Sequence, residues 1–438
     1  MKHITVDLGN ITGRIRPMHA VNNGPNKARS DQTRGNFDTY AALHIPYSRN
    51  HDAAHCAAYG GEHIVDVHCI FPNFDADVND PASYDFFLTD LYTENIMDAG
   101  SKIFYRLGAS IEHRLKKYGT VKPADYLKWA QICEHIILHY NEGFADGHQW
   151  NIEYWEIWNE ADMDEDDCPN KRTWGGTKQE FFDFYKTVAV YLKGRFPHLK
   201  IGGPALGFRK DWIEDFFAFM TKDGERVPID FFSWHYYTHR VEKLMARCEY
   251  FKDLVTRYGY GDVEIIVSEW NYVADWGEGF IDTILDIKGI KGAAFVAAIM
   301  AAVQKSGLVD MLMYYDMRPG TAFNGVFDTD TLRPLKTYRV FDWFDKLYTL
   351  GYEVAHTADD GDLYVCAAQD GEAWGAMIAY YTNEKDAAPK EVEISVQGAE
   401  QASVAVLDAA RFGDTAEPLP EGNVLCIQPN TVVFLSNK

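Results

Sequence analysis

Short apolar runs alternate with longer segments of helical periodicity over residues 8–348, and this alternation constrains the fold more than any other feature. Such a pattern is typical of parallel β-strands joined by helical crossovers. The apolar runs lie at 14–21, 42–49, 102–107, 155–160, 199–204, 229–235, 263–269 and 311–316. A closed α/β barrel needs about eight strand–helix units, so we predict a TIM barrel over residues 8–348.

The segments between these runs carry apolar residues at helical spacing. After Pro123, one stripe of a predicted helix comprises Trp129, Ile132, Cys133, Ile136, Ile137 and Tyr140. A second helix is predicted from about Lys178 to Gly194, because glycine commonly terminates helices. Further helices are predicted around the Ala-rich segment 293–303 and over 335–347.

The pattern changes at Gly351, where short alternating strands separated by Gly, Asp, Asn and Pro replace the helices. The predicted strands are 363–368, 374–381, 391–396, 403–407, 424–428 and 431–436. Runs of this kind indicate an all-β sandwich, so we predict a second domain over residues 351–438. We expect the opening strand 2–6, which precedes the barrel, to join it.

Composition restricts the partners and the compartment. The 65 acidic and 42 basic residues give a formal net charge of −23, and clusters of Lys and Arg are what nucleic acids and anionic membranes require. We therefore expect neither as a partner, while the surface of the sandwich favours a homo-oligomer. Seven cysteines without a C-x-x-C pair, and no secretion signal in the first residues, predict a cytoplasmic protein.

Two of the predicted strands end in glutamate. Glu160 closes the run 155–160 (WEIWNE), and Glu269 lies in the run 265–271 (IIVSEWN). Side chains at the ends of barrel strands converge on one face, where TIM barrels hold their active sites. Two carboxyl groups placed this way suit glycosidic bond cleavage, since one protonates the leaving oxygen and the other meets the positive charge developing at the anomeric carbon. The sequence therefore predicts a glycoside hydrolase that needs no cofactor.

A metal site is the main alternative. His51, His55 and His63 lie near Asp52, but their spacing matches no helical two-histidine site. The acidic run 162–167 lacks the glycine and the terminal glutamate of an EF-hand. We predict no metal ligands, and a metal-dependent TIM-barrel hydrolase stays open as an alternative.

The motifs W-N-E and S-E-W-N resemble those of clan A of the retaining glycoside hydrolases, and within it the β-xylosidase and α-L-iduronidase family. Further segments that match in the same order are 21–25 (VNNGP), 49–52 (RNHD), 201–205 (IGGPA) and 235–237 (HYY). The family usually has proline after the first glutamate, where this chain has Ala161. The resemblance implies a TIM barrel, a C-terminal β-sandwich and a retaining mechanism.

The resemblance also implies roles for individual residues. Glu160 would be the general acid/base and Glu269 the nucleophile that forms a covalent glycosyl-enzyme, while Asn159 would bond the sugar hydroxyl beside the anomeric carbon. The supporting residues would be Arg49, which keeps Glu269 ionised, Asn23 and His51, which touch the sugar, and His235 and Tyr237, which orient the two carboxylates.

Electrostatics gives an independent reason for two different carboxyl groups. Retention needs them about 5–5.5 Å apart, where like charges resist ionising together. We expect Trp155 and Trp158 to favour a neutral Glu160 by desolvation. Trp276, which lies in a polar loop, is predicted to stack on a sugar face.

The sequence leaves the sugar open. We predict β-xylosidase-like action on terminal bonds of pentose-containing oligosaccharides. An arabinosidase-like or uronidase-like exo-glycosidase and a non-catalytic carbohydrate-binding protein are alternatives, and in each case the partner is an oligosaccharide or glycoside.

Overall fold

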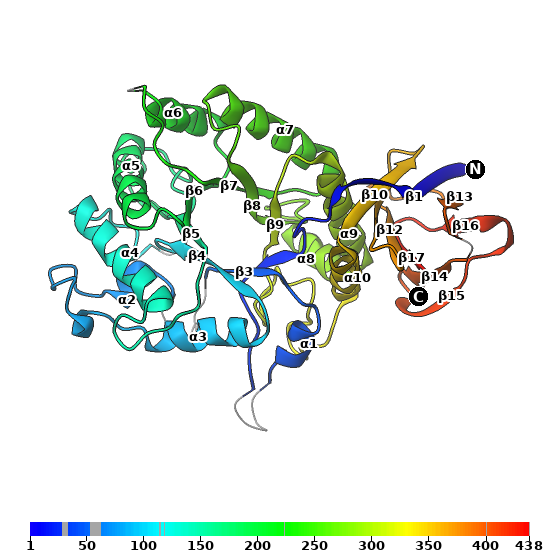
Figure 1. Cartoon of the computed structure of the whole chain (residues 1–438), viewed down its shortest axis with the longest axis horizontal. Coiled ribbons are helices and arrows are strands. Elements are labelled where there is room, and N and C mark those ends of the chain that lie inside the picture. Colours follow the sequence, from blue (N-terminus) through cyan, green and yellow to red (C-terminus); the bar gives the residue numbers. More distant parts are fainter. Residues whose placement is uncertain are drawn as a thin grey trace.

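The computed structural model of the chain contains a closed barrel surrounded by helices and, beside it, a separate β-sheet (Figure 1). The structure describes residues 1–28, 34–52, 63–113, 115–117, 119–222, 224–399 and 401–437. The barrel confirms the predicted TIM fold. No helix within these ranges has the length and apolar composition needed to cross a membrane.

Eight parallel strands form the barrel, each pairing with the next along the chain until β9 closes onto β2. They are β2 Ala20–Asn22, β3 Tyr47–Asn50, β4 Lys102–Leu107, β5 Tyr154–Ile157, β6 Lys200–Leu206, β7 Phe231–Tyr237, β8 Glu264–Asn271 and β9 Met311–Tyr314. Most predicted runs coincide with these strands. The run 14–21 does not, because Arg14 belongs to the second sheet and β2 begins only at Ala20.

Helices cover the outside of the barrel. They are α1 Phe37–Ala41, α2 Val67–Ile70, α3 Phe87–Asp98, α4 Tyr126–Asn141, α5 Lys178–Arg195, α6 Lys210–Met220, α7 Val241–Arg257, α8 Phe280–Lys288, α9 Ile290–Ser306 and α10 Lys336–Leu350, with a 3-10 turn η2 Pro81–Ser83. A second 3-10 turn, η3 Glu421–Asn423, lies between two strands of the second sheet. The predicted stripe of α4 is buried throughout. A capping box between Thr177 and Glu180 starts α5, because each side chain bonds the backbone N–H of the other.

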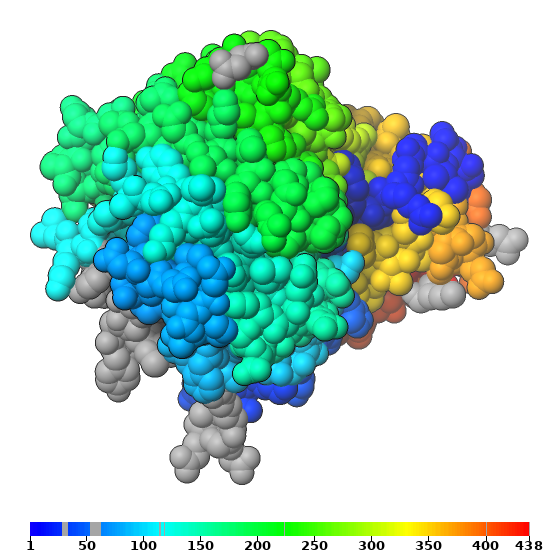
Figure 2. Space-filling model, turned by 60° about the vertical axis from the view of Figure 1, so that its left-hand side comes forward, coloured from blue at the N-terminus to red at the C-terminus, as the bar shows by residue number. Residues whose placement is uncertain are grey.

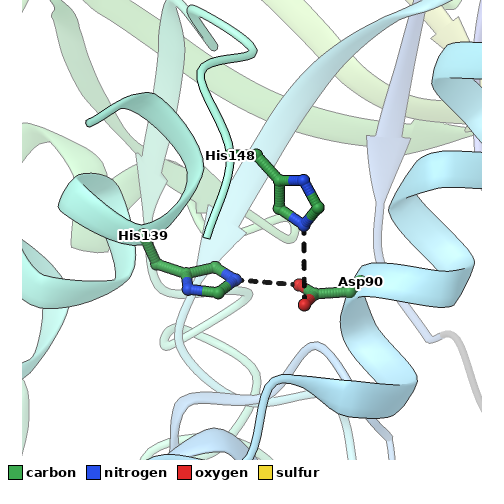
Figure 3. A group of neighbouring side chains, drawn as sticks. All are labelled: Asp90, His139 and His148. Carbon is green, nitrogen blue, oxygen red and sulfur yellow. Dashed lines mark hydrogen bonds and ion pairs between the residues drawn. The ribbon is translucent and has the colours of Figure 1, made fainter. Parts of the chain in front are cut away.

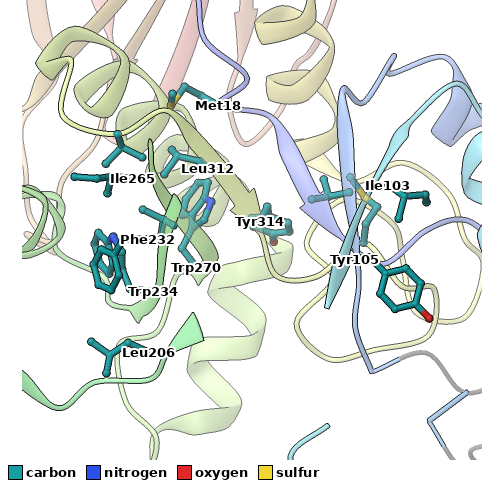
Figure 4. Packing of buried hydrophobic residues seen from close by; sticks show 14 of the residues in the cluster. Met18, Ile103, Tyr105, Leu206, Phe232, Trp234, Ile265, Trp270, Leu312 and Tyr314 are labelled. Atoms are coloured by element: carbon teal, nitrogen blue, oxygen red, sulfur yellow. The ribbon is translucent and has the colours of Figure 1, made fainter. Parts of the chain in front are cut away.

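Alternation along the barrel strands separates an outer apolar layer from the interior. On β7, Phe232 and Trp234 pack outward against Phe251 of α7. Figure 4 shows this outer layer continuing through Ile265, Trp270 and Leu312. A smaller inner cluster comprises Ala20, Phe104, Tyr154, Phe231, Ile266, Met311 and Met313.

A bulge in β8 decides where Glu269 points. The pairing with β7 passes from Trp234 opposite Val267 to His235 opposite Glu269, so Ser268 is the extra residue. Without the bulge, Glu269 would share the outward side of Val267, since side chains alternate along a strand. With it, Glu269 faces the interior, and Trp270 packs outward on Phe295 of α9.

The second sheet has nine strands in the order β15-β14-β17-β12-β11-β10-β1-β13-β16. They are β1 Lys2–Arg14, β10 Tyr352–Ala358, β11 Leu363–Gln369, β12 Trp374–Tyr380, β13 Lys390–Gln397, β14 Ser403–Leu407, β15 Phe412–Pro418, β16 Val424–Ile427 and β17 Thr431–Ser436. All belong to one curled, mainly antiparallel sheet with a core of its own, so the C-terminal part of the chain forms the expected all-β unit.

The N-terminal strand lies inside this sheet. β1 pairs antiparallel with β10 and parallel with β13, and it contributes Ile4 and Val6 to the core. Figure 2 shows the dark blue N-terminal residues against the yellow and orange surface of the C-terminal strands. On the barrel side, Trp343 of α10 stacks on Phe434 of β17, which joins the sheet to the barrel.

Candidate active site

A cleft of about 430 Å³ opens where the barrel strands end. The predicted site residues that line it are His51, Glu160, Tyr237, Glu269 and Trp276. The others, Asn23, Arg49, Asn159 and His235, are buried behind its wall. The structure therefore brings all nine together in two layers, one facing the cleft and one supporting it.

Arg49, at the end of β3, is fully buried and serves four acceptors. Its Nε donates to Oε2 of Glu156 at 2.6 Å, and its Nη2 donates to Oδ1 of Asn159 at 2.8 Å. Its Nη1 donates to Oε1 of Glu269 at 2.7 Å and to Oδ1 of Asn22 at 3.0 Å. The guanidinium thus fixes Glu269 and Asn159 relative to each other.

Glu269 accepts hydrogen bonds on both carboxylate oxygens. Besides Arg49 on Oε1, the hydroxyl of Tyr237 donates to Oε2 at 2.6 Å. Burial raises the pKa of Glu269, while His235 and Arg49 act in the opposite direction. The two donors are those that sequence analysis expected for the nucleophile.

Glu160 follows β5 in a left-handed backbone conformation, with φ 47°, and its N–H donates to the carbonyl of Ala205 at 2.9 Å. Its Oε1 lies 2.8 Å from Nδ1 of His235. Burial, and to a smaller extent the nearby Asp162, raises the pKa of Glu160 to about 8. At neutral pH this carboxyl group keeps its proton.

The two glutamates face each other across His235. One carboxyl oxygen of Glu160, one of Glu269 and a ring nitrogen of His235 all lie within 4.8 Å of one another. Retaining glycosidases hold their carboxyl groups about 5–5.5 Å apart, whereas inverting enzymes need about 6.5–9.5 Å. The separation seen here fits a direct attack by one carboxylate on the anomeric carbon.

Sequence reasoning did not single out Asp162, which is fully buried beneath the loop that follows β6. Its carboxylate accepts the backbone N–H groups of Gly207, Phe208 and Arg209 at 2.7–2.8 Å. This charge is therefore held in place next to Glu160. The sequence places it in an acidic run, and nothing in that run signals which member turns inward.

His51 bridges the cleft wall and Glu269. The Nε of Arg106 donates to its Nδ1 at 3.1 Å, so the ring proton is on Nε2, which lies 3.3 Å from both Asp52 Oδ1 and Glu269 Oε1. Burial lowers the pKa of His51 well below its ordinary value, although Asp52 opposes this. Both ring nitrogens are thus engaged, which argues against the alternative metal cluster; His55 lies outside the described residues.

Asn23 supports His51 from behind. Its Oδ1 accepts the backbone N–H of His51 at 3.3 Å and the hydroxyl of Tyr92 at 3.2 Å. Asn23 is fully buried and does not line the cleft, so it is placed to orient His51.

Two further cleft residues, Asp52 and Tyr315, were not among the predicted contacts. The hydroxyl of Tyr315 donates to Oδ2 of Asp52 at 2.7 Å. Burial alone would raise the pKa of Asp52, but His51, His63 and Arg318 together lower it. Tyr315 directly follows β9, so the strand-end signal that identified Glu160 could also have found it.

Aromatic rings form the rim. Trp276 is 59% exposed, and its ring centroid lies 5.9 Å from those of Phe280 and Phe323 and 5.5 Å from that of Tyr237. An exposed indole beside the two glutamates is placed as the predicted sugar platform would be.

The tryptophans next to Glu160 do not face it, contrary to our expectation. Trp155 stacks on Tyr105, and Trp158 packs against Trp129 and Trp174, all in the outer apolar layer. Alternation directs Trp155 outward, and Trp158 turns away with φ 70°. Burial of Glu160 in the cleft wall therefore has another source than these two indoles.

Comparisons with known proteins place this geometry in context. The sequence model described as "Glycosyl hydrolases family 39" matches residues 59–413. A β-xylosidase of Geobacillus stearothermophilus is 25% identical over 312 residues, which cover 64% of this chain and 57% of that protein. A β-xylosidase of Caldicellulosiruptor saccharolyticus is 32% identical over 169 residues, which cover 35% of this chain and 31% of that protein.

The match thus spans little more than half the length of the first of these relatives and about a third of the second. Among solved structures, a glucosidase from Croceicoccus marinus superimposes with a TM-score of 0.78 at 19% identity, covering 100% of this chain and 98% of the other. At that identity the likeness concerns the fold alone.

Proposed function

This chain belongs to glycosyl hydrolases family 39, and on that premise we propose that it is a retaining glycosidase acting on terminal β-xylosidic bonds. The β-xylosidases among its relatives support the choice of sugar. The observation that carries the mechanism is the close approach of Glu160 and Glu269, whose facing oxygens lie within 4.8 Å.

In the first step, Glu160 acts as the acid. Its raised pKa of about 8 keeps the carboxyl group protonated at neutral pH, so it can deliver this proton to the glycosidic oxygen as the bond to the anomeric carbon breaks. A carboxylate oxygen of Glu269 forms the new bond to that carbon. The aglycone leaves as a neutral alcohol, and the sugar remains as an ester on Glu269.

In the second step, the roles reverse. Glu160, now ionised, removes a proton from a water molecule as the water oxygen attacks the anomeric carbon. The ester bond breaks, Glu269 regains its charge, and Glu160 regains its proton. Arg49 and Tyr237 stabilise the carboxylate of Glu269 each time it is released.

The charges around the cleft favour a neutral sugar over a uronide. A uronate needs a cationic side chain directed at its carboxylate. Of the described residues that line the cleft, Arg172 carries the one guanidinium, and its Nε already donates to Asp164 at 2.9 Å. A pentose, which has no such carboxylate, suits this lining.

A panel of aryl glycosides tests the proposal. We expect the β-xyloside to release its phenol fastest, ahead of the β-glucoside, the α-L-arabinofuranoside and the α-L-iduronide. A 2-deoxy-2-fluoro xyloside should trap an ester that mass spectrometry locates on Glu269. Absence of hydrolysis across the whole panel by folded protein that still binds sugar would instead support a non-catalytic binding protein.

Two variants separate the roles of the glutamates. Glu269→Ala should abolish turnover of every substrate. Glu160→Ala should keep the first step on substrates with activated leaving groups, and added azide should restore turnover as a glycosyl azide of retained configuration. Full activity of either variant on an unactivated glycoside would remove the assignment.

A further inference from the structure

A second group of ionisable side chains lies on the outer wall of the barrel, where none of its members lines the cleft. Asp90 comes from α3, His139 from α4, and His148 from the loop between α4 and β5 (Figure 3). The Nε2 atom of His139 lies 3.0 Å from Oδ1 of Asp90, and the Nε2 atom of His148 lies 3.5 Å from Oδ2. Two helices and the loop that follows the second of them thus direct ligand-type atoms at one point.

The hydrogen bonds of His139 leave a lone pair facing Asp90. Its Nδ1 lies 2.7 Å from the carbonyl oxygen of Phe144, which can only accept, so Nδ1 carries the proton. In the neutral ring, Nε2 then holds a lone pair directed at the carboxylate oxygen of Asp90. Two lone pairs at 3.0 Å repel, so a positive charge is needed between them.

His148 distinguishes a proton from a larger cation. Its Nε2 is buried and finds no hydrogen-bond partner among the described residues. A second proton on His139 would satisfy its contact with Asp90, but it would leave the Nε2 of His148 with only the 3.5 Å contact to Oδ2 of Asp90, which does not meet the geometry of a hydrogen bond. A metal ion bound by all three side chains satisfies each of them.

We propose that Asp90, His139 and His148 form a binding site for a divalent transition-metal ion, with Zn²⁺ as the best match. Two imidazole nitrogens and one carboxylate oxygen are ligands that Zn²⁺ prefers. The three ligand atoms lie within 4.8 Å of one another, and tetrahedral Zn²⁺ with bonds of about 2.0–2.1 Å places its ligands about 3.4 Å apart. Water would complete the coordination at the partly exposed side.

The ligands are held in position by their surroundings. The ring of Phe86 stacks on His139 at 3.5 Å, and the ring of Trp150 stacks on His148 at 3.7 Å. The backbone N–H of His148 donates to the carbonyl of His139 at 2.6 Å, which fixes the loop on the end of α4. A metal-binding histidine commonly donates its other ring N–H to a backbone carbonyl, as His139 does to Phe144.

The role of this site is structural. The ion would join α3, α4 and the loop that leads into β5, the strand whose end presents Asn159 and Glu160. Because the ion is bound by the folded arrangement, it should raise the temperature of unfolding in proportion to its occupancy. It takes no part in the reaction proposed for the cleft.

Calorimetric titration of the full chain with Zn²⁺, after treatment with a chelator and dialysis, tests the site. We expect one equivalent to bind, and His148→Gln to weaken binding by about tenfold or more, since even loss of an outer partner costs 10- to 100-fold. His135→Gln is the matched control, because His135 lies one turn earlier on α4 and bonds the carbonyl of Gln131 at 2.8 Å. Asp90→Asn provides a second ligand variant.

The cleft itself offers ligand-type atoms on Glu160, His235 and Glu269, so the titration is repeated in Glu269→Gln. The Glu269→Gln variant should still bind Zn²⁺ at the proposed site. Zn²⁺ should raise the unfolding temperature of the wild type, of Glu269→Gln and of His135→Gln, but not that of His148→Gln. Equal affinity of the wild type and His148→Gln, or binding that is lost only in Glu269→Gln, would overturn the proposal. So would a folded wild type that binds no Zn²⁺.

Discussion

The Nη1 atom of Arg49 donates a 2.7 Å hydrogen bond to Oε1 of Glu269, although 220 positions separate the two residues in the chain. Both side chains are buried, so little water competes for either charge. The same guanidinium also holds Glu156, which is buried beneath the cleft. One cation therefore compensates two buried carboxylates, and only one of these faces the cleft.

Replacing Arg49 by methionine should damage both stability and activity. Removing one partner of a buried ion pair costs about 3–5 kcal/mol, because the other charge is left uncompensated. Urea unfolding measures this loss, and the exposed pair of Arg226 with Asp262 gives the control, for which Arg226→Met should cost about 1 kcal/mol or less. Equal losses of unfolding free energy in the two variants would contradict the conclusion that Arg49 compensates buried carboxylates.

The pH profile of kcat/KM should have an alkaline limb set by Glu160. Its pKa of about 8 means that the acid form disappears as the pH rises past that value, and activity on poor leaving groups falls with it. Asp162→Asn removes a charge that raises this pKa, so the limb should move to lower pH. An unmoved limb in that variant, with activity retained, would show that another group controls it.

Glu160 should also make stability depend on pH. Its pKa in the folded state, about 8, is above the ordinary value of 4.5, so the folded state binds the proton more tightly. The resulting stabilisation is complete below about pH 4.5 and is lost as the pH rises through about 8. Glu160→Gln cannot titrate, so its free energy of unfolding should increase relative to the wild type across this window. Parallel curves for the two proteins would disprove the shift.

Tyr237→Phe should lower kcat/KM by about 10- to 100-fold, the effect of losing a hydrogen bond to a charged group. Its hydroxyl donates to Glu269 at 2.6 Å, and the phenyl ring can keep its packing. Tyr272→Phe is the matched control, since the hydroxyl of Tyr272 donates to Asp286 at 2.7 Å outside the cleft. Similar kcat/KM values in both variants would show that the hydroxyl of Tyr237 does not contribute to the reaction.

The residues at the ends of the barrel strands were predictable because the apolar run of each strand can be recognised in the local sequence. The apolar run before Glu160 and the run around Glu269 identify barrel strands, and parallel strands bring their ends to one face. β15 was missed because its side chains are mostly exposed and polar, so no alternation marks it. The outward turn of Trp158 was missed because it depends on one left-handed backbone angle.

The contacts that support the two glutamates depend on how segments distant in the sequence pair with each other, which no single segment encodes. The bulge at Ser268 exists only in the pairing of β8 with β7. Asp162 finds its partners in backbone amides more than 40 positions later, which have no signature in the sequence. The side chains that converge on the cleft, and Arg49 as the expected partner of Glu269, could therefore be named from the sequence, whereas Asp162, which raises the pKa of Glu160, could not.

The position of β1 has a consequence for the order of assembly. β1 precedes the barrel in the chain, whereas its neighbours β10 and β13 follow the barrel. Both pairings span more than 300 positions, so they belong to the slow, non-local class of contacts. During synthesis, Ile4 and Val6 must wait for residues 352–397, and a nascent chain that holds a finished barrel still exposes this strand to pairing with other molecules.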